Sequence, residues 1–112
     1  MPLKIILTGD INLMNVTDPA VPFRRVAAEF RSAGIVFSNL ECCLYDPPHG
    51  HSVDSEGFYA APGTGGDALK LAGIQAVGIA NNVNYGEAAI KSSLARLDEI
   101  GIALTGAGAN RD

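Results

Sequence analysis

Polar side chains follow three apolar segments of this sequence, at the point where each segment ends. The three strongest candidates are Asp10, Glu41 and Asn82, and further polar residues beside them are Asn12, Asn39 and Asn81. Carboxylate and amide oxygens are the ligands that hard divalent cations such as Mg²⁺, Ca²⁺ and Mn²⁺ prefer in proteins. The pattern therefore predicts an oxygen-rich polar site, provided that the fold brings the three segment ends together.

The same residues also have a purely structural interpretation, without any role in ligand binding. Asp and Asn often cap a helix or form a turn directly after a strand, so each position taken alone has an ordinary explanation. Three such positions at one sheet edge are harder to explain in this way. Glu41 is the least easily explained, because glutamate is neither a favoured N-cap nor a turn residue.

Two histidines and two glycine-rich segments are weaker candidates. His49 and His51 are close enough in sequence to bind one metal ion, but their Pro/Gly-rich setting favours two exposed loop side chains. The segment 63–66 lacks the Lys-Ser/Thr of a phosphate-binding loop, and no helix follows 106–108 in the sequence. A nucleotide-binding α/β domain, which would rest on these glycines alone, is a third and weaker hypothesis.

The elements that must position these residues alternate between strand and helix. Short apolar runs predict buried strands over 3–8, 35–41, 76–80 and 102–105. Apolar spacing predicts helices over 23–30, 67–72 and 84–100, the last begun by an Asn84/Glu87 capping box and ended by Gly101. A long loop is expected over 45–66. This alternation predicts a parallel α/β sheet of about four strands, with helices as crossovers and ligands beyond the carboxyl ends of the strands.

Composition excludes several classes of protein. The 112 residues suit one domain, 1–112, and a chain that is 47% hydrophobic and 18% charged is far from the disordered class. A net charge of -4 without a clustered basic face argues against nucleic-acid binding. No apolar stretch reaches the roughly 18 residues of a membrane span. The adjacent Cys42 and Cys43 are expected to be small buried thiols in a reducing compartment, so we expect a cytoplasmic protein.

In order along the chain, four motifs resemble one known family. They are Gly9-Asp10, the run 38–41 (Ser-Asn-Leu-Glu), the run 78–82 (Gly-Ile-Ala-Asn-Asn) followed by Tyr85-Gly86, and the tail 97–110. Together they resemble the CapA family, which is associated with capsule and poly-γ-glutamate synthesis and is related in fold to calcineurin-like metallophosphatases. The resemblance covers nearly the whole chain. It implies a fold that resembles half of a metallophosphatase sandwich.

The resemblance also implies roles for particular residues. Asp10 and Asn82 match the positions of metal ligands, and Glu41, with Asn39, matches the place of a metal-bridging acid. The cofactor would be one or more divalent ions, with Mn, Mg, Fe and Zn all open. The activity would be metal-dependent hydrolysis or transfer on a phosphoester or a γ-glutamyl-type polymer, because paired metal ions polarise a phosphoryl oxygen and generate a hydroxide nucleophile.

Two departures from the family pattern weaken this expectation. Val83 stands where the family usually has a histidine after Asn-Asn, and Asn84 stands where an acid follows. The family domain is also longer, with later histidine motifs, so we expect this chain to be a truncated N-terminal part. We therefore expect weak metal binding and little hydrolysis. The alternative function is a non-catalytic binding or assembly module that forms homo-oligomers or pairs with a partner half-domain.

Overall fold

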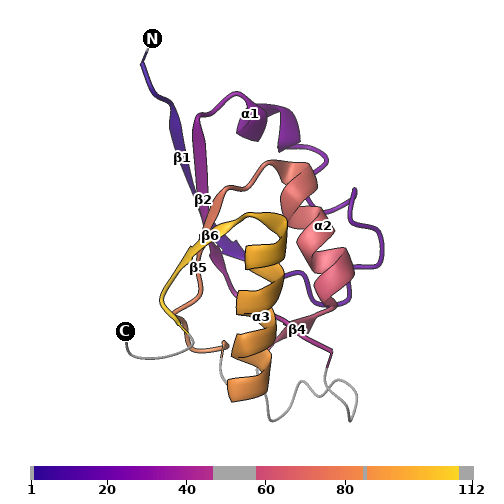
Figure 1. Ribbon diagram of the computed structural model, residues 1–112. Helices are drawn as coiled ribbons and strands as arrows, with labels where there is room; N and C mark the ends of the chain where they lie inside the picture. Colours follow the sequence, from indigo (N-terminus) through magenta and orange to yellow (C-terminus); the bar gives the residue numbers. More distant parts are fainter. Residues whose placement is uncertain (1, 47–57, 85, 109–112) are drawn as a thin grey trace.

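The main sheet has four parallel strands, as the alternation of elements predicts. In the computed structural model, which describes residues 2–46, 58–84 and 86–108, the strands are β1 (Ile5–Ile11), β2 (Ile35–Leu40), β5 (Ala76–Gly78) and β6 (Ala103–Thr105). They are hydrogen-bonded in that order. The helices between them are α1 (Ala27–Arg31), α2 (Pro62–Ala72) and α3 (Glu87–Ile100) (Figure 1). A short parallel pair, β3 (Cys43–Leu44) and β4 (Tyr59–Ala60), lies beside them.

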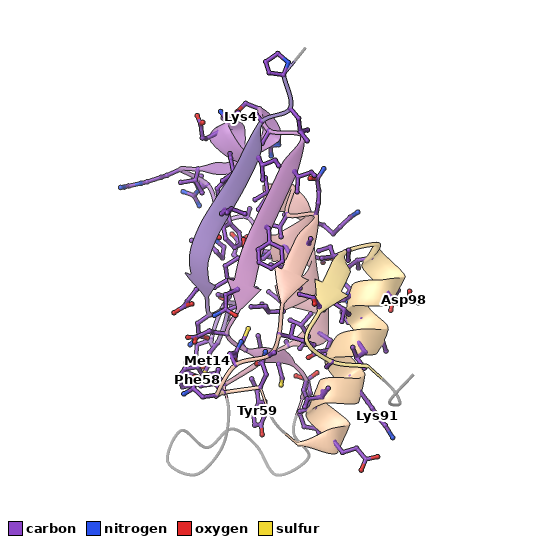
Figure 2. The ribbon with its side chains drawn as sticks, turned by 90° about the vertical axis from the view of Figure 1, so that its left-hand side faces the viewer. Lys4, Met14, Phe58, Tyr59, Lys91 and Asp98 are labelled. Carbon is purple, nitrogen blue, oxygen red and sulfur yellow. The ribbon has the colours of Figure 1, made fainter. Side chains whose placement is uncertain are left out.

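All three helices cover the same face of the main sheet. Each crossover moves the chain in the same direction across the sheet, and crossovers of one hand then place their helices on one side. The burial of β2 follows this arrangement, because Val36, Ser38 and Leu40 are buried while Ile35 and Phe37 are not. Figure 2 shows the sheet from the side that the helices leave bare. The arrangement is compatible with half of a metallophosphatase-like fold.

We call the bare side the open face. Its strand residues are Ile5, Leu7, Asp10, Ile35, Phe37, Asn39, Ala76, Gly78, Ala103 and Thr105. Leu7 is 74% exposed and Ile5 is 54% exposed, which is unusual for aliphatic residues in the strand of a folded domain. The only hydrophobic core among the described residues lies on the other side, between the sheet and the helices, where Leu40, Leu69 and Leu97 are fully buried.

Helix α2 begins five residues earlier than the sequence predicts. We expected a loop over 45–66, but Tyr59–Ala60 forms β4 and the helix starts at Pro62; residues 47–57 lie outside the described part. Two of the glycines that resemble a turn, Gly65 and Gly66, lie in close tertiary contact. A Cβ on Gly65 would lie 2.8 Å from Leu44, and one on Gly66 would collide with the Arg96 side chain. Close tertiary contact therefore overrides the poor helix propensity of glycine.

The ends of α3 show one correct and one wrong prediction. Gly101 ends the helix in the left-handed conformation, with φ of 75°, as expected for a glycine at this position. The predicted capping box is wrong, because the residue before the first turn is Gly86 and no side chain caps it. Asn84 instead points back to the ends of two strands.

Two further observations concern the cysteines and the length of the helices. Cys42 and Cys43 are both buried and neither forms a disulfide. Within the described part of the chain, no helix combines the length and apolar character needed to cross a membrane.

Candidate functional site

A bulge in β1 decides which way Asp10 points. Leu7 pairs with Phe37 and Asp10 pairs with Asn39, so β1 has one residue more than β2 in this interval. Because side chains alternate along a strand, one extra residue moves every later side chain to the opposite face. Asp10 thereby joins the row of Phe37 and Asn39 at the edge of the open face, and Ile11 turns into the core, where it is 7% exposed.

A chain of side-chain hydrogen bonds joins three of the predicted polar residues. Nδ2 of Asn39 donates to Oδ1 of Asp10 at 2.7 Å, and Nδ2 of Asn81 donates to Oδ1 of Asn39 at 3.0 Å. These residues come from β1, from β2 and from the loop after β5. Asp10, Asn39 and Asn81 therefore lie together at the carboxyl ends of the strands.

The loop after β5 is built on two asparagines. Oδ1 of Asn81 accepts the backbone N–H groups of Val83 and Asn84, both at 3.2 Å, so its side chain folds the loop into a tight turn. Nδ2 of Asn84 donates to the carbonyl oxygens of Leu40 at 2.7 Å and Ile79 at 3.1 Å. Asn82, between them, is exposed, and its side chain forms no hydrogen bond with the described residues.

Glu41 lies one residue beyond β2. Its N–H donates to the carbonyl oxygen of Ile11 at 2.7 Å, which continues the β1–β2 ladder and fixes the backbone of Glu41 beside the end of β1. The side chain is partly exposed, as is that of Asn39 two residues earlier. Asn12 is placed differently, because its Oδ1 accepts the N–H of Met14 at 2.9 Å and so forms a local turn. His49 and His51 lie outside the described residues.

The donor set can be compared with the needs of a metal ion. Among the described residues, no three His, Cys, Asp or Glu side chains lie close enough to hold one. Asp10 and Glu41 supply two carboxylates at adjacent strand ends, and among the described residues a third ligand would come from an amide such as Asn82, a hydroxyl or a backbone carbonyl. Oxygen donors of this kind fit Mg²⁺, Mn²⁺ or Ca²⁺, with water filling the remaining positions. Only the chemical type of these donors suits a hard cation, and the ligand roles of the three residues stay a prediction.

The neighbouring thiol does not belong to this donor set. Burial raises the pKa of Cys42 to about 11, although the N–H of Leu13, 3.5 Å from the sulfur, partly offsets the effect. A thiol with this pKa stays protonated at neutral pH, whereas metal binding and nucleophilic attack both require the thiolate. Cys42 therefore packs as a small apolar residue behind the site.

The sequence as a whole matches a family described as bacterial capsule synthesis protein PGA_cap, over residues 4–112. The chain belongs to this family. No curated protein matches the chain closely enough to add to this result. The match agrees with the resemblance to the CapA family seen in the motifs, and it covers the strand ends that carry Asp10, Glu41 and Asn82 in this PGA_cap protein.

Sequence reasoning missed two features of the site. The bulge has a signal, since Gly9 lies inside an apolar strand pattern and an isolated glycine there often marks a bulge. The role of Asn84 had no comparable signal, because its spacing to Glu87 favoured a helix cap. The bonds from Asn84 to Leu40 and Ile79 depend on the neighbouring strand, which local spacing does not show.

Proposed function

We propose that this PGA_cap protein binds one divalent cation through Asp10, Glu41 and Asn82, and that the site is a weakened form of a metal-dependent phosphoesterase centre. The observation that carries the proposal is the bulge in β1, which turns Asp10 out of the core and places it beside Asn39. Without the extra residue, the alternation would direct a carboxylate toward the apolar core. Bulges that re-aim a side chain are common next to functional sites.

The chemistry expected of the site is limited. A bound cation would supply charge stabilisation to a phosphoryl oxygen and would lower the pKa of a bound water molecule. The residues of this chain would bind the cation and hold it at the edge of the sheet. Val83 occupies the place where the CapA resemblance implies a histidine, and a valine side chain can neither donate nor accept a proton. We therefore expect cation binding with little turnover, on a phosphoester or a capsule polymer.

Titration with Mn²⁺ tests this proposal. Binding is measured by calorimetry and by the EPR signal of free Mn²⁺, and turnover is measured with bis-p-nitrophenyl phosphate. Two carboxylates and one amide should give a dissociation constant of roughly 10⁻⁴ to 10⁻³ M, the range of weak oxygen sites. Asp10→Ala and Glu41→Ala should each abolish measurable binding.

Asp98→Ala is the matched control for this titration. It removes the same charge from the exposed end of α3 and should leave the affinity unchanged. Unchanged binding in the Asp10 and Glu41 variants would contradict the proposed ligands. Micromolar binding of two ions with rapid diester turnover would contradict the proposed weakness of the site.

The open face supports a second function, that of an assembly module. Apart from Asp10 at its edge, none of the described strand residues on this face carries a charge. Leu3, Ile5 and Leu7 are all more than half exposed. An uncharged apolar face is complementary to another copy of itself, and two sheets pack face to face about 10 Å apart. We propose that a second copy of the chain covers this face in an isologous dimer.

Sedimentation velocity over a range of protein concentrations tests the assembly function. The wild type should shift from monomer to dimer with increasing concentration, and Leu7→Lys should remain a monomer. Leu71→Lys is the matched control, because Leu71 is 50% exposed on α2, on the helix side of the molecule. A wild type that stays monomeric, or a Leu7 variant that dimerises as well as the control, would refute the dimer.

A further inference from the structure

Asn81 uses every hydrogen-bonding position of its side chain. Nδ2 donates to Oδ1 of Asn39 at 3.0 Å and to the carbonyl oxygen of Leu40 at 2.9 Å. Oδ1 accepts from the N–H groups of Val83 and Asn84. A carboxamide offers two donor hydrogens and two acceptor lone pairs, so none is left for a metal ion or a substrate. Asn81 therefore acts on the site through other residues.

The orientation of the Asn81 carboxamide is fixed by backbone groups of known polarity. A carbonyl oxygen such as that of Leu40 can only accept, so it must face the nitrogen of Asn81. Backbone N–H groups can only donate, so those of Val83 and Asn84 must face the oxygen. The side chain cannot turn over without breaking three of these bonds.

This fixed orientation is passed on to Asn39. Because Asn81 presents its nitrogen, Asn39 must present its oxygen in return, and its own nitrogen then faces Asp10. Oδ1 of Asp10 receives that donor at 2.7 Å, which holds the carboxylate in one rotamer and leaves Oδ2 for another partner. A reversed Asn39 would instead turn its oxygen toward the carboxylate, and the two acceptors would repel each other.

We infer that Asn81 is a positioning residue that sets the direction of an amide relay, Asn81–Asn39–Asp10, and thereby orients Asp10 for the cation. This inference rests on the proposed cation site. It gives Asn81 a role separate from its role in folding the loop. The two roles use opposite ends of the side chain, the nitrogen for the relay and the oxygen for the turn, so one substitution can separate them.

Asn81→Asp is the variant that separates the two roles. Its carboxylate still accepts the N–H groups of Val83 and Asn84, so the turn remains. It can no longer donate to Asn39 or to the carbonyl oxygen of Leu40, so Asn39 loses the partner that sets the direction of its carboxamide and its nitrogen is no longer held toward Asp10. Loss of such an outer partner typically weakens metal binding by about tenfold or more. We expect a weakening of this size for Mn²⁺, although the variant adds a negative charge that would by itself attract the cation.

Asn15→Asp is the control for the added charge. Asn15 lies in the exposed loop after β1, and its positive φ of 65° is tolerated by aspartate. This control should bind Mn²⁺ as well as the wild type or better. Asn39→Ala removes the donor to Asp10 and keeps the bonds of Asn81 to backbone groups that fold the loop, so it tests the relay even if Asn81→Asp does not fold. Affinity equal to that of the wild type in Asn81→Asp or in Asn39→Ala would overturn the inference.

A measurement without metal separates this inference from the proposed function. In the otherwise wild-type protein, Asp10→Ala removes the acceptor of the side-chain NH₂ group of Asn39. This substitution should move the ¹⁵N–¹H resonance of that group. In the Asn81→Asp background, where Asn39 is no longer held in that direction, Asp10→Ala should move the resonance less. If the wild type binds no Mn²⁺ but this pattern appears, the cation site fails and the relay stands. If Asp10→Ala moves the resonance equally in both backgrounds, the relay is refuted.

Discussion

Replacing Ser93 by alanine should remove one of the polar contacts that hold β3 against α3. Oγ of Ser93 accepts the N–H of Leu44 at 2.8 Å, and Ser93 is 2% exposed while Leu44 is fully buried. The N–H groups on either side, from Cys43 and Tyr45, bond to the β4 side, so that of Leu44 points to the helix. Oγ of Ser92 donates to the carbonyl oxygen of Leu44 at 2.6 Å. The two serines thus satisfy the backbone N–H and carbonyl groups of Leu44 that a further strand would otherwise pair with.

The size of the effect follows from one orphaned donor. A buried N–H that loses its acceptor destabilises the fold by about 1–3 kcal/mol, and the better helix propensity of alanine returns at most about 0.5 kcal/mol. We expect Ser93→Ala to lower the free energy of unfolding by about 1–2.5 kcal/mol. For a chain of this length, that is a fall in Tm of roughly 4–20 °C.

Urea denaturation followed by far-UV circular dichroism measures this change. The midpoint should fall while the m-value stays the same, because the surface exposed on unfolding is unchanged. Lys91→Ala is the control on the same helix, since it breaks only the exposed ion pair with Glu87 and should leave the midpoint unchanged. A Ser93→Ala midpoint equal to that of the wild type would refute the argument that these serines complete β3.

Two further predictions concern the core. Burial raises the pKa of Cys42 from 9.0 to about 11, so the stability that this thiol contributes is present below pH 9 and is lost as the pH rises through 11. Urea unfolding across this pH range should show a loss of about 2–3 kcal/mol in the free energy of unfolding. The Cys42→Ala variant should lack this loss. Gly63→Ala should raise the Tm, since a Cβ there meets nothing within 4 Å in the helix, whereas Gly65→Ala should lower it, since its Cβ would lie 2.8 Å from Leu44. Thermal scans that show the same sign for both glycine variants would contradict this reading of α2.

Local patterns were sufficient to predict the sheet. Uniform apolar runs such as 35–37 predict strands buried in a parallel sheet, and the order of elements then follows from the alternation. Gly101 is a reliable signal because only a residue that tolerates positive φ can end the helix in this way. These features depend on neighbours in sequence, so the sequence alone is enough to find them.

The features that sequence reasoning missed depend on neighbours in space. The glycines of α2 look like a turn until Leu44 and Arg96 are seen to pack against them. Asn84 has the spacing of a helix cap, yet it bonds to two strand ends. The direction of Asp10 depends on the bulge opposite β2; Gly9 is a local signal for it, but only the pairing of the two strands fixes its position. Each of these is a long-range contact that overrides a local preference.

The most direct test of the proposed site is to locate the bound ion. Anomalous diffraction from crystals soaked in Mn²⁺ should show one peak about 2.0–2.6 Å from carboxylate oxygens of Asp10 and Glu41 and from the side-chain oxygen of Asn82. The same peak should disappear in Asp10→Ala crystals soaked in the same way. A peak elsewhere on the molecule, or none at saturating Mn²⁺, would contradict the claim that the bulge in β1 turns Asp10 outward to bind a cation.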